Sequence, residues 1–210
     1  MSSSGKPQGV LYIISAPSGA GKTSIFRELL ASRPELRESI SYTTRAPRGN
    51  ERDGVEYHFV SHEQFGEMVQ AGEFAEWAEV HGNRYGTAKA TLQQAREAGD
   101  DLLLDIDVQG AAQLRASGVD GVTIFVLPPG MAELRRRLAG RNTDSPEVIE
   151  QRMANAADEI REAERFDYIV VNDDLSQAVA TVQAILLAEK VRRNRVLGAL
   201  PAEFGLKSPT

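Results

Sequence analysis

The chain has 210 residues, a length typical of one domain with inserted parts. Apolar residues make up 41% and charged residues 26%, so we expect a buried core rather than general disorder. The 24 Lys and Arg against 30 Asp and Glu give a net charge of −6, which disfavours a chain-wide surface for nucleic acid or anionic membranes. The absence of cysteine excludes disulfides, thiolate zinc sites and cysteine nucleophiles.

Targeting signals are also missing from the sequence. No apolar run approaches the roughly 18–20 residues of a membrane span. The opening segment MSSSGKPQG contains no signal-peptide core. We therefore expect a soluble, cytoplasmic protein with neither nucleic-acid nor membrane partners.

Four short runs rich in β-branched and other apolar residues predict strands that are buried on both faces. They lie at residues 10–14, 102–106, 122–127 and 168–171. Segments between and after them predict helices at residues 23–32, 91–98, 109–117 and 175–193, the second and third of which are followed by glycine. The alternation of strands and helices predicts an α/β fold with a mostly parallel sheet and helices on both faces.

Two segments interrupt this alternation. Residues 40–88 are polar, with short strand-like pieces and a helix near 62–70 whose start, Ser61-x-x-Gln64, fits a capping box. Residues 131–165 are predicted to be helical with a break at 140–145, where Ser145 fits an N-cap and Pro146 the first turn. We expect one domain over residues 8–188, with its core at about 8–39, 89–130 and 164–190, and flexible termini at 1–7 and 198–210.

A phosphate-binding loop is predicted between the first strand and the first helix. The run APSGAGKT matches G-x-x-x-x-G-K-[ST] at every specified position but the first, where Ala16 replaces glycine. In such a loop, backbone N–H groups surround a phosphate chain, Lys22 reaches the β- and γ-phosphates, and Thr23 binds Mg²⁺. We therefore expect the phosphates of a nucleotide, with Mg²⁺, at a site formed by Ala16, Pro17, Ser18, Gly19, Ala20, Gly21, Lys22, Thr23 and Ser24.

Two carboxylates follow the apolar run at residues 102–104. Asp105 and Asp107 are two apart, so on a strand they would point to the same side of the sheet. They also lie at its carboxyl end, where open α/β sheets bind ligands. One of them is a candidate to hold Mg²⁺ through water, with a solvated strand end as the plain alternative.

The polar segment at about 40–88 contains features that suit a phosphorylated substrate. Arg45 and Arg48 are three apart beside hydroxyl residues, and two guanidinium groups suit a phosphate monoester. Together with the loop, the sequence resembles the guanylate kinase family, whose members phosphorylate GMP with ATP. The matching runs are APSGAGKT (16–23), SYTTRAPR (41–48), DGVEYHF (53–59), EFAEWAEVHGNRYGT (73–87), LDIDVQG (104–110), LRRRLAGR (134–141) and IVVNDD (169–174).

The resemblance covers about residues 9–190. It implies a P-loop NTPase core of three α/β/α layers, a GMP-binding insertion at about 40–88 and a lid at about 131–163. By matching position, it implies a GMP site formed by Ser41, Arg45, Arg48, Tyr57, Glu76, Tyr85, Gly86, Thr87, Asp105 and Asp107. It also implies that Asn172 contacts the adenine of ATP, and that the catalytic residues are Lys22, Arg45, Arg137, Arg141 and Arg152. Arg137 and Arg141 are four apart, so one helix face would present both.

The chemistry of Glu76 agrees with this assignment. Guanine presents two adjacent donors, N1–H and N2–H₂, and a carboxylate is a two-pronged acceptor. The Ser41 and Thr87 hydroxyls would donate to O6 of the base. We expect Glu76 to be solvated in the free protein, so that Glu76→Gln would leave the melting temperature unchanged.

Two other readings remain open from the sequence. One is a P-loop kinase for another small phosphorylated metabolite, such as a ribosyl bisphosphate, which would need the arginines but no guanine-reading residues. The other is a scaffold of the same fold that binds protein partners and has lost catalysis. Retention of Lys22, Thr23 and the three lid arginines favours the enzyme. The oligomeric state, monomer or homo-oligomer, does not follow from the sequence.

Overall fold

The computed structural model describes residues 9–80, 82–140, 145–197 and 200–206. Its centre is a five-stranded sheet in the order β2-β7-β1-β8-β9, and every neighbouring pair is parallel. The strands are β1 (Leu11–Ser15), β2 (Leu36–Glu38), β7 (Asp101–Asp105), β8 (Val122–Leu127) and β9 (Tyr168–Val171). The four predicted strands are confirmed. β2 was not predicted, because only one of its three residues is buried and no apolar run marks it.

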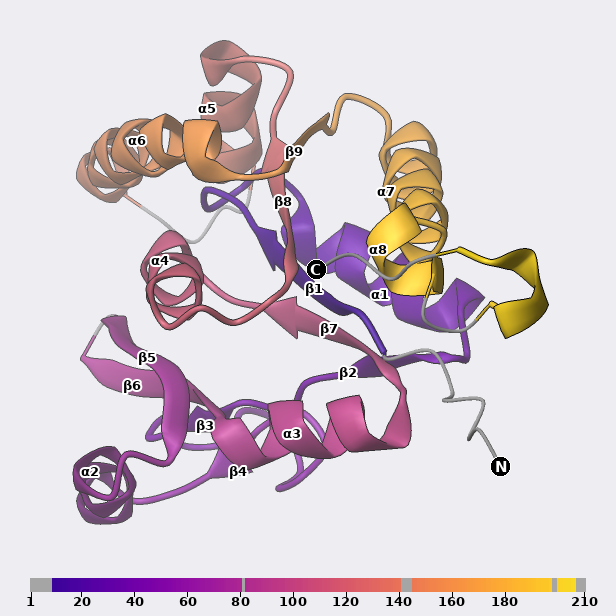
Figure 1. Ribbon diagram of the computed structural model, residues 1–210. Coiled ribbons are helices and arrows are strands. Elements are labelled where there is room, and N and C mark those ends of the chain that lie inside the picture. Colours follow the sequence, from indigo (N-terminus) through magenta and orange to yellow (C-terminus); the bar gives the residue numbers. More distant parts are fainter. Residues whose placement is uncertain (1–8, 81, 141–144, 198–199, 207–210) are drawn as a thin grey trace.

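Helices cover both faces of this central sheet, which confirms the three-layer architecture (Figure 1). α1 (Lys22–Ser32) and α7 (Leu175–Lys190) pack on one face through an apolar cluster that includes Phe26, Leu29 and Val182. α3 (Lys89–Ala98) and α4 (Val108–Ala116) cover the other face, where Leu114 packs with Leu104. Burial on both sides explains why the central strands read as continuous apolar runs.

The polar segment folds into a second sheet with the strand order β4-β3-β6-β5. Its elements are β3 (Tyr42–Thr43), β4 (His58–Phe59), α2 (His62–Gln70), β5 (Phe74–Val80) and β6 (Asn83–Ala88). The capping box of α2 is confirmed, since Ser61 and Gln64 bond each other's backbone N–H. β6 runs directly into α3, so the second sheet is joined to the core without a linker.

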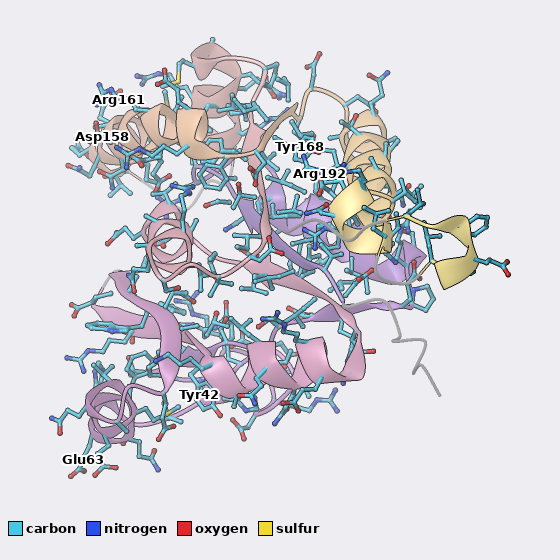
Figure 2. The ribbon with its side chains drawn as sticks, in the orientation of Figure 1. Tyr42, Glu63, Asp158, Arg161, Tyr168 and Arg192 are labelled. Atoms are coloured by element: carbon cyan, nitrogen blue, oxygen red, sulfur yellow. The ribbon has the colours of Figure 1, made fainter. Side chains whose placement is uncertain are left out.

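The second interruption forms a helical pair, α5 (Met131–Ala139) and α6 (Pro146–Arg161), followed by a 3₁₀ helix at Glu162–Arg165. The pair has a small core of its own, formed by Leu134, Leu138, Met153 and Ala156. The predicted N-cap is confirmed, because the Ser145 side chain accepts the N–H of Val148. On the outer side of α6, Asp158 and Arg161 form an exposed ion pair (Figure 2).

The end of the chain returns to the central sheet. α7 ends at Lys190, earlier than predicted, and is followed by α8 (Arg193–Val196) and a 3₁₀ helix at Ala202–Phe204. Glu189 is only 1% exposed; it accepts a hydrogen bond from the Tyr168 hydroxyl and forms an ion pair with Arg192. Tyr168 and Arg192 are labelled near each other in Figure 2. Residues 1–7 lie outside the described residues, and the predicted flexibility of 198–210 stays a prediction.

None of the helices in the described part of the chain is both long and apolar enough to cross a membrane.

Candidate active site

The predicted phosphate loop connects β1 to α1 and has the backbone that such a loop requires. Gly19 and Gly21 have φ angles of 91° and 95°, in the left-handed region that favours glycine. A Cβ atom on Gly21 would lie 2.2 Å from Nδ2 of Asn172, so a side chain is excluded there for a second reason. The loop leads into the N-terminus of α1, where backbone N–H groups and the helix dipole favour an anion.

Ala16 stands at the first motif position, where glycine is usual. It is half-buried and packs against the apolar cluster beneath β1. A methyl group therefore fits at this position.

Lys22, the first residue of α1, reaches across to the end of β7. Its Nζ lies 2.5 Å from Oδ1 of Asp105 and donates to the Ile106 carbonyl at 3.1 Å. Thr23 and Ser24, which follow it, are exposed. A lysine, a carboxylate and accessible hydroxyls at a helix N-terminus form a donor set that fits a nucleotide phosphate with Mg²⁺.

Asp107 does not occupy the position that was predicted for it. β7 ends at Asp105, and Asp107 is the N-cap of α4, with Oδ1 accepting the N–H of Gly110 at 2.8 Å. The expectation that both carboxylates project from one strand is therefore wrong. The two nevertheless line the same cavity, because the chain turns into α4 directly above the sheet edge.

This cavity, of about 170 Å³, lies between the end of the central sheet and the second sheet. It brings together most of the predicted substrate residues with the loop lysine. The residues that line it are Lys22, Ser41, Tyr57, Glu76, Ala78, Val80, Tyr85, Gly86, Asp105, Ile106 and Asp107. The central prediction of a shared site for these distant segments is consistent with this arrangement.

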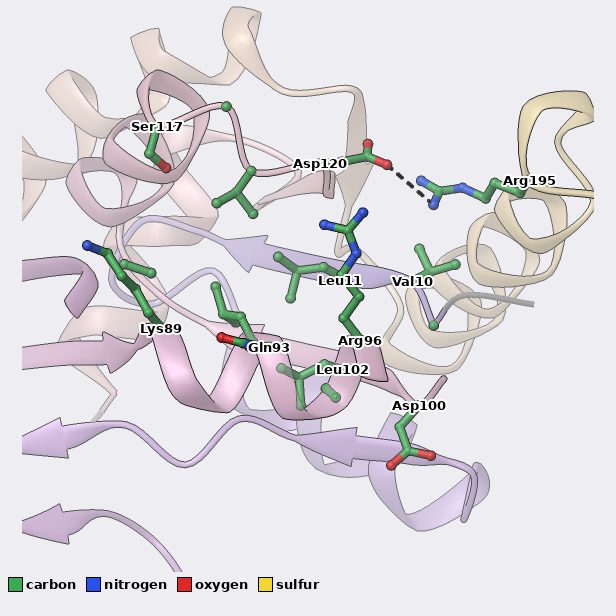
Figure 3. Close-up of a pocket in the computed structure, with 16 residues that line it drawn as sticks. Val10, Leu11, Lys89, Gln93, Arg96, Asp100, Leu102, Ser117, Asp120 and Arg195 are labelled. Carbon is green, nitrogen blue, oxygen red and sulfur yellow. Dashed lines mark ion pairs between the residues drawn. The ribbon is translucent and has the colours of Figure 1, made fainter. Parts of the chain in front are cut away.

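A larger hollow of about 660 Å³ lies elsewhere, between α3, α4 and the start of β1 (Figure 3). Leu11, Lys89 and Arg96 line it, and Asp120 pairs with Arg195 at its rim. None of the predicted site residues that the structure describes lines this hollow. Its size therefore does not make it the active site.

Glu76 is buried, with only 4% of the residue exposed. Pairing of β5 with β6 sets it opposite Thr87, whose hydroxyl donates to Oε1 at 2.6 Å. Burial raises the pKa of Glu76 to about 7, against a smaller opposing effect of the Thr87 hydrogen bond. The expectation of a solvated carboxylate is wrong, and the Thr87 hydroxyl is directed at Glu76 rather than left free for a base.

The two predicted phosphate arginines converge on a residue that the sequence analysis missed. Glu51 accepts two hydrogen bonds from the Arg45 guanidinium, at 2.9 and 3.0 Å, and one from the backbone N–H of Arg48 at 2.7 Å. The Arg45 guanidinium also lies 5.3 Å from the centre of the Tyr57 ring, which contacts Tyr85 edge-on. With 10% of its side chain exposed, Arg45 is no solvated surface residue. In the sequence, the only indication of this pairing was the position of Glu51, three residues after Arg48.

The helical pair also reaches the phosphate loop. Arg137 on α5 donates from Nη2 to the Asn172 carbonyl at 3.0 Å and from Nε to Glu133 at 2.7 Å. Arg152 is half-buried on α6. α5 ends at Ala139, and Arg141 lies outside the described residues, so its shared face with Arg137 stays a prediction.

Asn172 follows β9 and is 5% exposed. Its Nδ2 donates to the Ala20 carbonyl at 2.8 Å, so its amide holds the phosphate loop. The phosphate loop is thus held by a residue that follows β9, the outermost strand on one side of the central sheet. The predicted contact of Asn172 with adenine stays a prediction.

Burial of Glu76 predicts a pH-dependent effect of Glu76→Gln on stability. A carboxyl in the unfolded chain loses its proton near pH 4.5, whereas folded Glu76 keeps its proton to about pH 7. Ionisation therefore costs the folded state about 3 kcal/mol as pH rises through this range. Glutamine avoids this cost, so at pH 8 the variant should melt about 6–12 °C above the parent, with a smaller excess at pH 5.

Calorimetric melting at both pH values measures the difference. Glu79→Gln is the matched control, because Glu79 lies on the same strand but is exposed. A constant difference between Glu76→Gln and the parent across pH 5–8 would contradict a raised pKa at Glu76.

Comparison with known proteins agrees with this geometry. The family description "Guanylate kinase" matches residues 8–189. The guanylate kinase of Syntrophotalea carbinolica is 59% identical over 191 residues, or 91% of each chain. That of Geobacter sulfurreducens is 55% identical over 96% of this chain and 99% of its own. The crystal structure of guanylate kinase from Anaplasma phagocytophilum aligns with a TM-score of 0.76 and 34% identity, over 98% of this chain and all of that one.

The family match spans nearly the whole described chain, and the residues gathered at the sheet edge are those on which the resemblance depended. The chain belongs to the guanylate kinase family.

Proposed function

We propose that this chain transfers the γ-phosphoryl group of ATP to GMP, giving ADP and GDP, in the cavity between the phosphate loop and the second sheet. One observation carries the proposal. Lys22 of the loop and Glu76 of the second sheet line the same cavity. A phosphate donor on the loop and a base held by Glu76 would therefore face one shared space.

The phosphate of GMP binds to Arg45 and Arg48 with the hydroxyls of Tyr57 and Tyr85. Glu51 supports this assignment, because its two hydrogen bonds fix the plane of the Arg45 guanidinium before a substrate arrives. A pre-oriented guanidinium loses less conformational freedom when it binds a phosphate.

The guanine base is read mainly by Glu76, whose carboxylate accepts from N1–H and N2–H₂. Ser41, Gly86, Asp105 and Asp107 complete the wall of the cavity around it. The buried carboxyl keeps its proton to near neutral pH in the free protein, and two guanine donors would favour the ionised form. Adenine, with an acceptor at N1, would meet this carboxylate unfavourably.

ATP binds with its phosphates on the loop, from Ala16 to Ser24, and with Lys22 at the β- and γ-phosphates. Thr23 would hold Mg²⁺, with Asp105 as the nearby carboxylate, and the ion would neutralise charge on the transferred group. Asn172 contacts the loop through its hydrogen bond to Ala20. If Asn172 also contacts adenine, the adenine base of ATP would lie at the end of β9.

Catalysis of phosphoryl transfer depends on positioning and on cations around the equatorial oxygens. Arg137 and Arg152 of the helical pair, and Arg141 between them in the sequence, supply these cations together with Lys22 and Arg45. Closure of the helical pair and the second sheet over the substrates would exclude water, which otherwise competes as the acceptor. A cytoplasmic location, and the absence of nucleic-acid and membrane partners, remain predictions from the sequence.

The first kinetic prediction concerns Lys22. Replacement by methionine keeps an unbranched side chain, one atom shorter, and removes the charge that faces the transferred phosphate. We expect kcat to fall by about 100-fold or more, while the melting temperature stays near that of the parent. Lys89→Met is the control, since Lys89 is exposed on α3. Retention of more than about a tenth of the parent kcat would remove Lys22 from the mechanism.

The second prediction tests the substrate. Glu76→Gln places a donor against a donor of guanine, so kcat/KM for GMP should fall by about 30- to 1000-fold with the KM for ATP unchanged. Steady-state ADP release measures both constants. Equal losses with GMP and with IMP, whose base lacks the 2-amino group, would contradict the assignment of Glu76 as the guanine reader. Absence of any GMP-dependent ADP release from the parent would instead favour a scaffold.

A further inference from the structure

We infer that Gln113 is a positioning residue for guanine selection. It clamps strand β5 to helix α4 and so holds the Glu76 carboxylate in the position from which it can accept both donors of the base. The inference rests on the proposed role of Glu76.

The clamp consists of two hydrogen bonds between one side chain and one residue. Gln113 Oε1 accepts the backbone N–H of Trp77 at 3.1 Å, and Gln113 Nε2 donates to the Trp77 carbonyl at 2.7 Å. The amide of Gln113 thus binds the edge of β5 as a neighbouring strand would. Trp77 directly follows Glu76, so fixing its backbone fixes the origin of the Glu76 side chain.

β5 needs such support because of its place in the second sheet. It is the last strand of the order β4-β3-β6-β5, so one of its edges has no strand beside it in this sheet. On the other edge, the pairing with β6 is irregular between Phe74 and Glu76. The strand ladder is therefore interrupted directly before the residue that reads the base.

α4 contributes a second feature on the same side. Gly110 lies three residues before Gln113, so the two occupy neighbouring positions on the helix surface. A Cβ atom on Gly110 would lie 2.6 Å from Oε2 of Glu76. The helix therefore leaves room for the carboxylate at Gly110 and holds its strand at Gln113, while Asp107 caps the same turn.

Displacement of β5 should affect GMP more than IMP. A carboxylate in place accepts both N1–H and N2–H₂ of guanine, whereas hypoxanthine offers only N1–H. A shifted carboxylate loses the two-pronged geometry that distinguishes the bases. A general loss of folding or of closure would instead lower the turnover of both substrates alike.

The experiment compares Gln113→Met, which keeps the size of the side chain and removes both hydrogen bonds, with the parent. We expect the ratio of kcat/KM for GMP to that for IMP to fall by roughly tenfold or more, with the KM for ATP within about twofold. Hydrogen exchange at the Trp77 amide should accelerate. Gln113→Glu, which keeps only the acceptor, should give an intermediate ratio. Gln93→Met is the control, since Gln93 is exposed on α3 and its amide bonds Glu97.

An unchanged GMP/IMP ratio in both Gln113 variants would overturn the inference, whatever the absolute rates. Glu76→Gln separates this outcome from failure of the proposed function. If Glu76→Gln lowers the ratio and the Gln113 variants do not, only the clamp is refuted. If Glu76→Gln itself leaves the ratio unchanged, the base-reading role fails first.

Discussion

The site depends on one constraint, namely that five parallel strands end at the same edge of the sheet. Lys22 follows β1, Asp105 ends β7, α5 with Arg137 follows β8, and Asn172 follows β9. Segments as far apart as 152 positions in the sequence meet there, as the Asn172–Ala20 hydrogen bond illustrates. The phosphate loop is consequently held by the sheet on both sides, by Asp105 at one and by Asn172 at the other.

The second constraint is electrostatic. A carboxyl that is buried in the wall of the cavity loses hydration, which raises the pKa of Glu76 toward neutrality. The group is therefore costly to ionise until donors reach it, and guanine supplies two of them side by side. Burial of Glu76 thus lowers the stability of the free protein at neutral pH, and the same burial suits the residue to selecting a base.

Much of this arrangement was accessible from the sequence. Apolar runs located four of the five central strands, and the GKT triplet with its flanking strand and helix located the loop. The start of α6 at Pro146 followed from a serine and a proline. These features are local, because they depend on neighbours within a few residues.

The parts that were missed depend on contacts between distant segments. Burial of Glu76 comes from α4 and from pairing with Thr87, neither of which its own strand reveals. The Glu51–Arg45 pair and the Gln113–Trp77 clamp are formed by polar side chains, those of Glu51, Arg45 and Gln113, of types that usually lie on a solvated surface. Asp107 was misplaced because a strand ending at Asp105 and one ending two residues later have nearly the same sequence pattern.

The most direct test of the account is an NMR titration of the Glu76 side-chain carboxyl, assigned by its absence in Glu76→Gln. In the free protein the chemical shift of the Glu76 carboxyl carbon should titrate with a pKa near 7. Saturating GMP should move this pKa toward or below the ordinary value of 4.5. Titration near 4.5 in the free protein, or a pKa that GMP does not lower, would contradict the claim that a buried carboxylate reads the guanine base.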